Sequence, residues 1–157
     1  MNVLGPQPLV PSSPGVTVRM QRQLRRDTAP EMAVRRGLHA MGLRFRLGWP
    51  VPGRPRRSVD IAFPGLRVAV FVDGCFWHGC PEHGTQPRAN KSWWAAKLAA
   101  NVARDRDTDQ ALDVAAWTVI RVWEHDDTDD VVAAIVEIVR RRRASATLSD
   151  TSRNIRS

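Results

Sequence analysis

Apolar residues recur every three or four positions in three stretches of the chain, the spacing that places them on one face of a helix. The first helix is predicted over residues 29–41, because a Thr-x-x-Glu capping box at 28–31 marks its start and Gly42 its end. The second is predicted from 92 to about 115, and the third begins at Thr128, which we expect to cap it. The apolar positions of the three stripes are Val34, Leu38, Met41, Trp94, Leu98, Val102, Leu112, Val131, Ile135 and Ile138.

Asp105 falls on the apolar stripe of the second predicted helix. A carboxylate is costly to bury unless it is paired, so either the helix breaks near this residue or the carboxylate meets a partner in a functional site. Of these two interpretations the sequence favours the break.

Between the first two helices the pattern changes to alternation or to short unbroken apolar runs, which are typical of strands. The first strand has a basic outer face and is followed by a predicted loop over 48–58, which is rich in Gly and Pro. The second carries Asp60 on the face opposite its apolar residues, and the third is a buried central strand. The four predicted strands cover residues 43–47, 59–63, 68–72 and 117–123. The element order is therefore helix, three strands, helix, strand, helix.

A chain of 157 residues is long enough for one domain whose core needs no disulfides. Residues 1–18 and 144–157 lack periodicity and are rich in small and polar residues, so we expect both ends to be disordered and the domain to cover 19–143. Neither an apolar run long enough to span a membrane nor a signal peptide is present, which favours a cytoplasmic protein without a membrane partner.

The net charge of +8 is concentrated in residues 19–57, where eleven arginines face only two acidic residues. A codon bias towards arginine would raise the charge everywhere, whereas a local basic block is what phosphate binding requires. Nucleic acid is thus the expected partner, with Met20, Arg22, Arg25 and Arg26 as candidate contacts. The second basic run, 140–143, is interpreted as a solvated helix end.

Residues 73–90 fit no regular element and contain the only two cysteines. Cys75-x4-Cys80-x2-His83, with His125 after the last strand, supplies two thiolates and two imidazoles for a tetrahedral structural zinc site. Two buried thiols that merely pack are the alternative, and Glu82 also stays open as an oxygen ligand.

Three further residues are candidates for catalysis. Asp60 lies on a strand that would fix its carboxylate rigidly for a divalent cation, although a solvent-facing aspartate gives the same pattern. His78 lies in the irregular segment, where an imidazole that titrates near neutrality can transfer a proton, with zinc ligation as the less favoured alternative. Glu31 is either the acceptor of the capping box or a support of the active site.

The aromatic residues divide into two groups. Trp49, Trp117 and Trp123 are expected in the core. Phe76 and Trp77 flank His78, and Trp93 and Trp94 begin the second helix, so these rings are placed to stack on bases or to wedge between them.

The run from Val70 to His83 resembles the signature segment of the very-short-patch-repair (Vsr) mismatch endonucleases. The resemblance extends over about residues 19–125. It implies a restriction-endonuclease-like α/β fold, with a mixed sheet of about four strands flanked by helices. It also implies that Asp60 binds magnesium together with the backbone carbonyl of Val72, that His78 is catalytic, and that an aromatic wedge enters the DNA at the mismatch.

Related nucleases of this fold place a Glu-x-Lys pair at the end of the third strand, whereas this chain has Val72-Asp73 with no lysine nearby. His78 must then do the work of that lysine, and the role of Asp73 stays open. The resemblance predicts a monomeric, magnesium-dependent endonuclease that nicks one strand at T:G mismatches to start short-patch repair. A zinc-stabilised DNA-binding module without catalysis and a restriction-type nuclease acting on paired or modified DNA are the alternatives.

Overall fold

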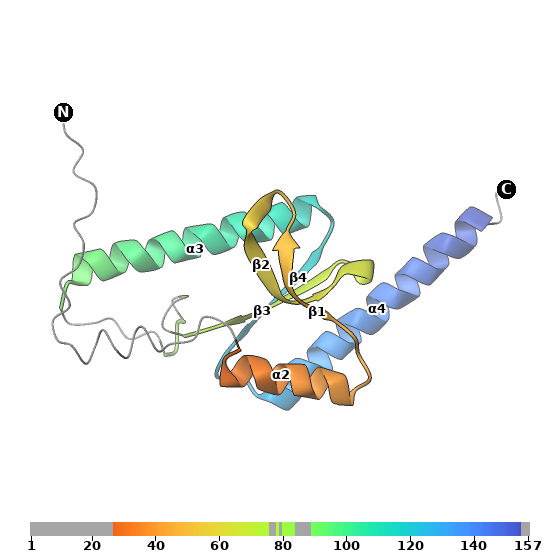
Figure 1. The fold of residues 1–157 in the computed structure, drawn as a ribbon, viewed down its shortest axis with the longest axis horizontal. Coiled ribbons are helices and arrows are strands. Elements are labelled where there is room, and N and C mark those ends of the chain that lie inside the picture. The colour runs from red at the N-terminus through yellow and green to blue at the C-terminus, as the bar shows by residue number, and fades with distance from the viewer. Residues whose placement is uncertain (1–26, 76–77, 79, 84–88, 155–157) are drawn as a thin grey trace.

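The computed structural model describes residues 27–75, 78, 80–83 and 89–154, with side chains as far as residue 148. The predicted order of helices and strands is confirmed (Figure 1). The elements are α2 (Ala29–Ala40), β1 (Arg46–Val51), β2 (Arg54–Phe63), the 3-10 turn η1 (Pro64–Leu66), β3 (Val68–Asp73), α3 (Lys91–Val114), β4 (Thr118–Trp123) and α4 (Thr128–Asn154).

The strands form one mixed sheet in the order β1-β2-β3-β4, which confirms the predicted fold class. β1, β2 and β3 pair antiparallel, while β3 and β4 run parallel with Val72 opposite Val122 and Asp73 opposite Trp123. A parallel pair requires a crossover, and α3 provides it, returning the chain from the end of β3 to the start of β4. The segment that carries the candidate zinc ligands therefore leaves the sheet at the end of β3.

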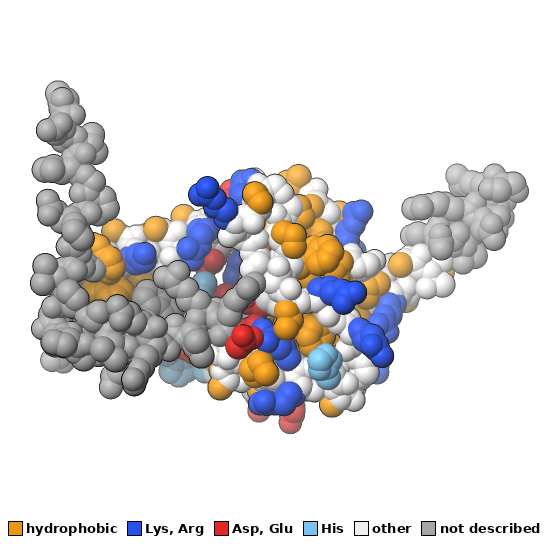
Figure 2. All heavy atoms as spheres, viewed as in Figure 1, with side chains coloured by type: hydrophobic (Ala, Val, Ile, Leu, Met, Phe, Trp, Pro, Cys, Tyr) orange, Lys and Arg blue, Asp and Glu red, His pale blue; other side chains and the backbone are white. Residues whose placement is uncertain are grey.

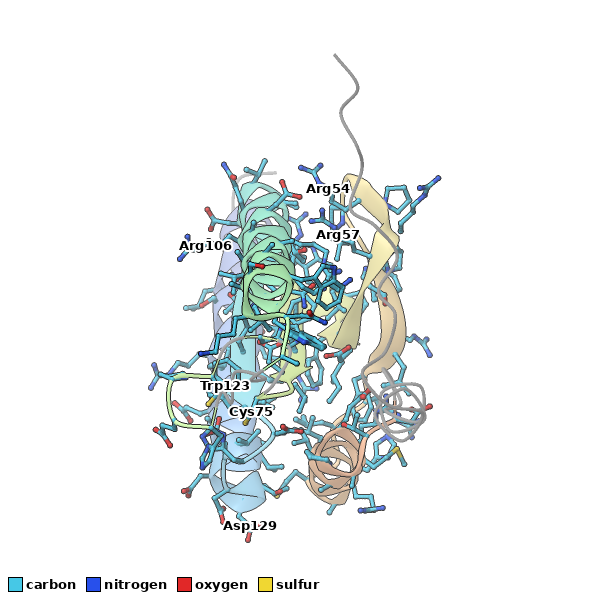
Figure 3. The ribbon with its side chains drawn as sticks, turned by 90° about the vertical axis from the view of Figure 1, so that its left-hand side faces the viewer. Arg54, Arg57, Cys75, Arg106, Trp123 and Asp129 are labelled. Carbon is cyan, nitrogen blue, oxygen red and sulfur yellow. The ribbon has the colours of Figure 1, made fainter. Side chains whose placement is uncertain are left out.

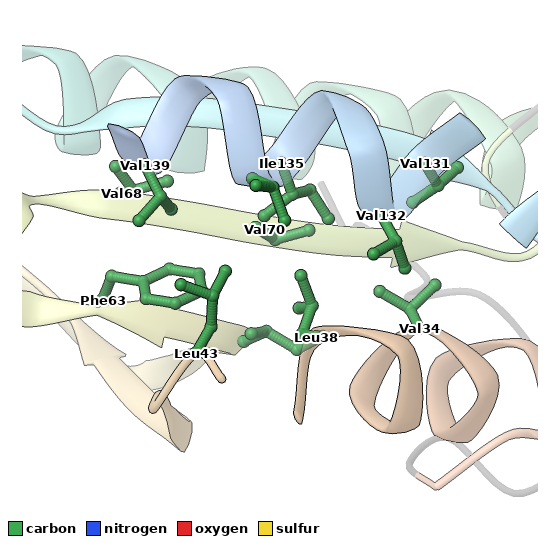
Figure 4. Close-up of a cluster of buried hydrophobic side chains, with 12 residues drawn as sticks. Val34, Leu38, Leu43, Phe63, Val68, Val70, Val131, Val132, Ile135 and Val139 are labelled. Carbon is green, nitrogen blue, oxygen red and sulfur yellow. The ribbon is translucent and has the colours of Figure 1, made fainter. Parts of the chain in front are cut away.

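Helices cover both faces of the sheet. α2 and α4 pack on one face over a cluster of apolar side chains from β2 and β3 (Figure 4). Gly37 lets these two helices approach closely, since a Cβ at this position would lie only 2.5 Å from Val132 Cγ2. α3 covers the other face, where Leu112 is fully buried and Trp49 and Trp117 pack at the margin. The predicted core placement of these two tryptophans is confirmed, and Trp123 is half-buried.

The loop predicted over 48–58 is wrong, because β1 and β2 form a continuous hairpin through this segment. Gly53, with φ of +71°, provides the turn. Proline is tolerated because β1 is an edge strand and the first part of β2 pairs only with β1, so Pro50 and Pro55 interrupt no central ladder. β1 therefore begins at Arg46, whereas the first strand was predicted to begin at residue 43.

α3 runs unbroken from Lys91 to Val114, so the break favoured near Asp105 is wrong. The carboxylate instead meets a partner, as described below. The cap of α4 is also corrected: the Asp127 side chain accepts the backbone N–H groups of Asp129 and Asp130 at 2.9 and 3.1 Å, and Thr128 is the first helical residue.

The C-terminal segment is helical as far as Asn154, where a disordered tail was predicted from residue 144. The hydroxyls of Ser145 and Thr147 donate to the carbonyls of Arg141 and Arg143 in the preceding turn of this helix. Arg142, predicted to lie at a solvated helix end, instead donates to the carbonyls of Leu66 and Ala116. No helix among the described residues is both long and apolar enough to cross a membrane.

Candidate active site and metal centre

Asp60 lies on β2, and its Oδ2 accepts the backbone N–H of Val72 on β3 at 3.0 Å. Burial raises the pKa of the Asp60 carboxyl to about 6, and the nearby charges of Glu31 and Asp73 act in the same direction. The hydrogen bond from the Val72 N–H and the charge of Arg121 lower this pKa and offset only part of the increase. A buried carboxylate in acidic surroundings is a site that a divalent cation would stabilise, so the predicted cation ligand is in suitable surroundings.

Glu31 is buried in the first turn of α2. Thr28 Oγ1 accepts the N–H of Glu31 at 3.4 Å, while Glu31 Oε2 accepts the N–H of Asp27 at 3.0 Å and Oε1 binds Arg35. This arrangement is close to the predicted capping box, but the N–H that donates to Glu31 belongs to Asp27, one residue before the N-cap Thr28. The Glu31 charge also raises the pKa of Asp60, so the cap role is observed and support of the active site stays a prediction.

His78 pairs with the residue that the sequence expected to break α3. Its Nδ1 lies 2.6 Å from Asp105 Oδ2 and 3.7 Å from Asp73 Oδ1. Burial by itself would lower the pKa of His78, but the hydrogen bond to Asp105 and the charges of Asp73 and Asp105 outweigh it, so this pKa is raised. The arrangement leaves Nε2 as the ring nitrogen available for proton transfer.

Asp73 is engaged by Arg121, a residue that the sequence analysis missed. Both Asp73 oxygens accept from Arg121 Nη1, at 3.0 and 2.9 Å, and Arg121 also binds Asp109 on α3. The sequence feature that could have pointed to Arg121 is that it interrupts the apolar run of the fourth predicted strand. Burial raises the pKa of Asp73, and the charge of Arg121 counteracts it.

The four predicted zinc ligands converge. One ligand atom from each of Cys75, Cys80, His83 and His125 lies within 4.8 Å of all the others. Both cysteines are buried, and Cys75 Sγ lies 3.0 Å from His125 Nδ1. Burial raises the pKa of the Cys75 thiol to about 12, with Cys80 and Glu124 adding to the effect, and a bound cation would reverse this because it stabilises thiolate.

This donor set, two sulfurs and two imidazoles, fits a closed tetrahedral zinc site. Glu82 is exposed and lies 3.6 Å from His125 Nε2, the ring nitrogen opposite the one that faces the sulfurs. It is therefore placed to orient the imidazole from outside the cluster rather than to belong to it. Asp73, two residues before Cys75, pairs with Trp123 of β4, and Figure 3 labels Cys75 and Trp123.

The predicted DNA contacts mostly fall where the structure gives no description. Met20, Arg22, Arg25, Arg26, Phe76 and Trp77 lie outside the described residues. Trp94 is 8% exposed and packs edge to face on Trp93, with ring centroids 4.8 Å apart. It therefore occupies a packing position in the DNA-free protein rather than an exposed one.

The basic block divides into paired and unpaired arginines. Arg54 and Arg57 extend from the hairpin towards α3 and bind Asp107 there, Arg54 through two hydrogen bonds of 2.8 Å (Figure 3). Exposed arginines of the block that make no ion pair with the described residues are Arg36, Arg44, Arg46 and Arg56. On the face shown in Figure 2, Lys and Arg side chains are spread over several elements rather than gathered in one patch.

The chain is similar to known DNA endonucleases. The sequence model of the family described as DNA mismatch endonuclease Vsr matches residues 16–83. The type II nicking enzyme V.NaeI of Lentzea aerocolonigenes is 46% identical over 133 residues, which is 81% of this chain and 78% of that protein. The type II nicking enzyme V.XorIIP of Xanthomonas oryzae is 42% identical, covering 70% and 79%, and the DNA mismatch endonuclease Vsr of Escherichia coli is 36% identical, covering 63% and 62%.

Proposed function

Because the chain belongs to the Vsr family of DNA endonucleases, we propose that it is a magnesium-dependent enzyme that nicks one strand of duplex DNA at T:G mismatches. The observation that carries the proposal is the meeting of two candidate groups at the end of β3. Val72 binds the Asp60 carboxylate, and the next residue, Asp73, faces His78. A candidate cation ligand and a candidate proton-transfer group thus contact neighbouring residues of β3, and phosphodiester hydrolysis requires both kinds of group.

Asp60 and the carbonyl of Val72 are the groups that would hold the magnesium ion. When bound, such an ion polarises the phosphate and lowers the pKa of a bound water molecule. Asp60 must be ionised for this role, and its pKa of about 6 leaves it mostly ionised at neutral pH.

His78 is the proposed general base. Asp105 accepts a hydrogen bond from Nδ1–H, which fixes the tautomer whose Nε2 is free to accept a proton. The attacking water transfers a proton to Nε2 as its oxygen bonds to phosphorus, and the phosphorus–oxygen bond to the leaving group breaks. Asp105 stabilises the imidazolium that forms.

The zinc site is proposed to be structural. His78 lies between Cys75 and Cys80, so a metal that joins both cysteines fixes the backbone on either side of the proposed base. Such a site supplies folding free energy to the protein.

Action at mismatches is supported by the mismatch endonuclease name of the E. coli relative, and cutting of one strand is supported by the nicking-enzyme names of the other relatives. The choice of T:G follows from the resemblance described for the sequence. Phe76 and Trp77, beside His78 in the sequence, are the proposed wedge. A mispaired step is easier to unstack than a matched one, so a wedge selects weakened sites by deformability.

The proposal is tested with 5′-labelled duplexes, each strand labelled in turn, incubated with and without magnesium. Wild type is expected to cut one strand of a T:G duplex, and to do so only when magnesium is present. Asp60→Asn is expected to bind the same duplex without cutting it. Binding without cutting by wild type would favour the zinc-stabilised binding module. Equal cutting of matched duplexes would favour a restriction-type nuclease.

A further inference from the structure

Arg121 projects from β4 into a group of three carboxylates next to the proposed base. Its Nη1 donates to both oxygens of Asp73, at 3.0 and 2.9 Å, and its Nε and Nη2 donate to Asp109 at 3.0 and 2.8 Å. The third carboxylate belongs to Asp105, whose Oδ1 lies 4.0 Å from Nη2. The guanidinium therefore joins the end of β3 to the middle of α3.

The position of this guanidinium is tightly determined. Its central carbon lies 4.4 Å from the centroid of the Phe71 ring, and the side chain is largely buried. A guanidinium that makes two-point contacts with two carboxylates and stacks on a ring is held in one orientation, which lysine could not reproduce. Arg121 is thus rigid enough to control the geometry of its neighbours.

Two carboxylates face the same nitrogen of His78. Asp105 Oδ2 lies 2.6 Å from Nδ1 and Asp73 Oδ1 lies 3.7 Å from it. Asp73 is 6% exposed, so without a cationic partner its charge would be buried and uncompensated, and the imidazole would be the nearest cation able to pair with it. Arg121 engages both Asp73 oxygens, which leaves Asp105 as the partner of Nδ1.

We propose that Arg121 is a positioning residue: by engaging Asp73, it directs His78 to Asp105 and so aims Nε2 at the reacting phosphate. This inference rests on the proposed role of His78 as the base. It also assigns a role to Asp73, which holds Arg121 in place. The residues facing His78 are then Asp73 from β3, Asp105 from α3 and Arg121 from β4, each with a separate task.

A purely structural ion pair offers a matched comparison on the same helix. Arg54 makes two hydrogen bonds of 2.8 Å to Asp107, which ties the hairpin to α3 without touching His78. If Arg121 only tied β4 to α3, Arg121→Met and Arg54→Met would lower the melting temperature and leave the His78–Asp105 hydrogen bond unchanged. Positioning predicts that Arg121→Met alone disturbs that bond.

The experiment uses the full chain as purified, without DNA, and records the low-field proton resonance of the His78 Nδ1–H group by NMR. The resonance is identified by its loss in His78→Gln. Arg121→Met should shift or broaden it, while Arg54→Met should leave it in place. In single-turnover nicking, Arg121→Met should slow the reaction by about 10- to 100-fold, because small misplacements of reacting groups have effects of this size. The dissociation constant for DNA should change by less than about twofold.

A double variant separates positioning from support of the fold. Asp73→Asn combined with Arg121→Met removes the competing charge together with its partner, so it should restore the resonance and most of the lost rate. A double variant as slow as Arg121→Met, or a resonance unchanged in Arg121→Met, would overturn the inference. If Arg121→Met does not fold, Asp109→Asn and the double variant provide the same test. If wild type does not nick DNA, the proposed function fails, while the resonance still tests the geometry.

Discussion

His78 Nδ1 lies 2.6 Å from Asp105 Oδ2, although the two residues are 27 positions apart and belong to the cysteine-containing segment and to α3. The pair has the arrangement of a base and the carboxylate that orients it. We therefore expect His78→Gln to slow nicking by about 10² to 10⁴-fold and Asp105→Asn by roughly 10²-fold, with the protein still folded.

Because the two groups act as one unit, the double variant should be no slower than His78→Gln alone. Single-turnover rates of the three variants, with melting temperatures as the control for folding, check this expectation. Effects that multiply in the double variant would mean that His78 and Asp105 act independently.

The ionised Asp60 carboxylate is expected to lower the free energy of unfolding of the DNA-free protein. Its pKa of about 6 is above the ordinary value of 3.8, so the folded state holds this proton more tightly than the unfolded state. The contribution of the Asp60 carboxyl to the free energy of unfolding is therefore present at low pH and is lost as the pH rises from about 4 to 6. Asp60→Asn removes this cost and should raise the free energy of unfolding at pH 7 by roughly 1 to 3 kcal/mol while abolishing cleavage.

Denaturant titrations of wild type and Asp60→Asn at pH 7 and at pH 4.5, without divalent cations, measure the difference. The gain should be smaller at the lower pH, since wild-type Asp60 is then largely protonated. An Asp60→Asn protein that is less stable than wild type at both pH values would contradict the environment described for this carboxylate.

One equivalent of zinc is expected in the purified protein. Cys80→Ser should lose the metal and lower the melting temperature or the yield of soluble protein, because the bound metal contributes folding free energy. Glu82→Ala is the matched control, since Glu82 approaches His125 from the side away from the sulfurs and its loss should leave the zinc content near one. Elemental analysis of wild type, Cys80→Ser and Glu82→Ala measures the zinc content of each protein. Metal-free wild type of unchanged stability would exclude the site.

The long elements follow from the sequence because their periodicity reports burial directly. α2, β3 and β4 lie close to their predicted positions, and the cluster of Cys75, Cys80, His83 and His125 was found from ligand spacing alone. The hairpin was missed because Gly and Pro indicate loops unless the strand is known to lie at an edge, which depends on the whole sheet.

Contacts made across the sheet were the hardest to predict. Asp105 was noticed as a polar residue on an apolar stripe, but choosing between a helix break and a buried partner required knowing that His78 lies opposite it. Arg121 and Asp73 are neighbours only because β3 and β4 pair in parallel, a register that local pattern does not contain.

The proposed wedge predicts that different substitutions change different properties. Trp77→Ala should reduce the preference for T:G over matched duplex, because each stacking contact contributes about 1 to 3 kcal/mol. Arg46→Ala, at an exposed arginine that makes no ion pair with the described residues, should weaken binding to both duplexes equally and flatten the salt dependence. Trp94→Ala should instead lower stability, since Trp94 is buried.

Binding to both duplexes at two salt concentrations distinguishes these effects. A folded Trp77→Ala protein with the full T:G preference would show that this ring takes no part in selection.

The proposed activity is tested most directly by the single-turnover rate of nicking by wild type on three duplexes that differ at one position, T:G, T:A and C:G, with saturating enzyme and magnesium. A T:G mismatch endonuclease should cleave one strand of the T:G duplex, with a rate at least about tenfold lower on both matched duplexes, the ratio expected from one lost stacking contact. Equal rates on the three duplexes, or no cleavage of any, would contradict the proposed activity.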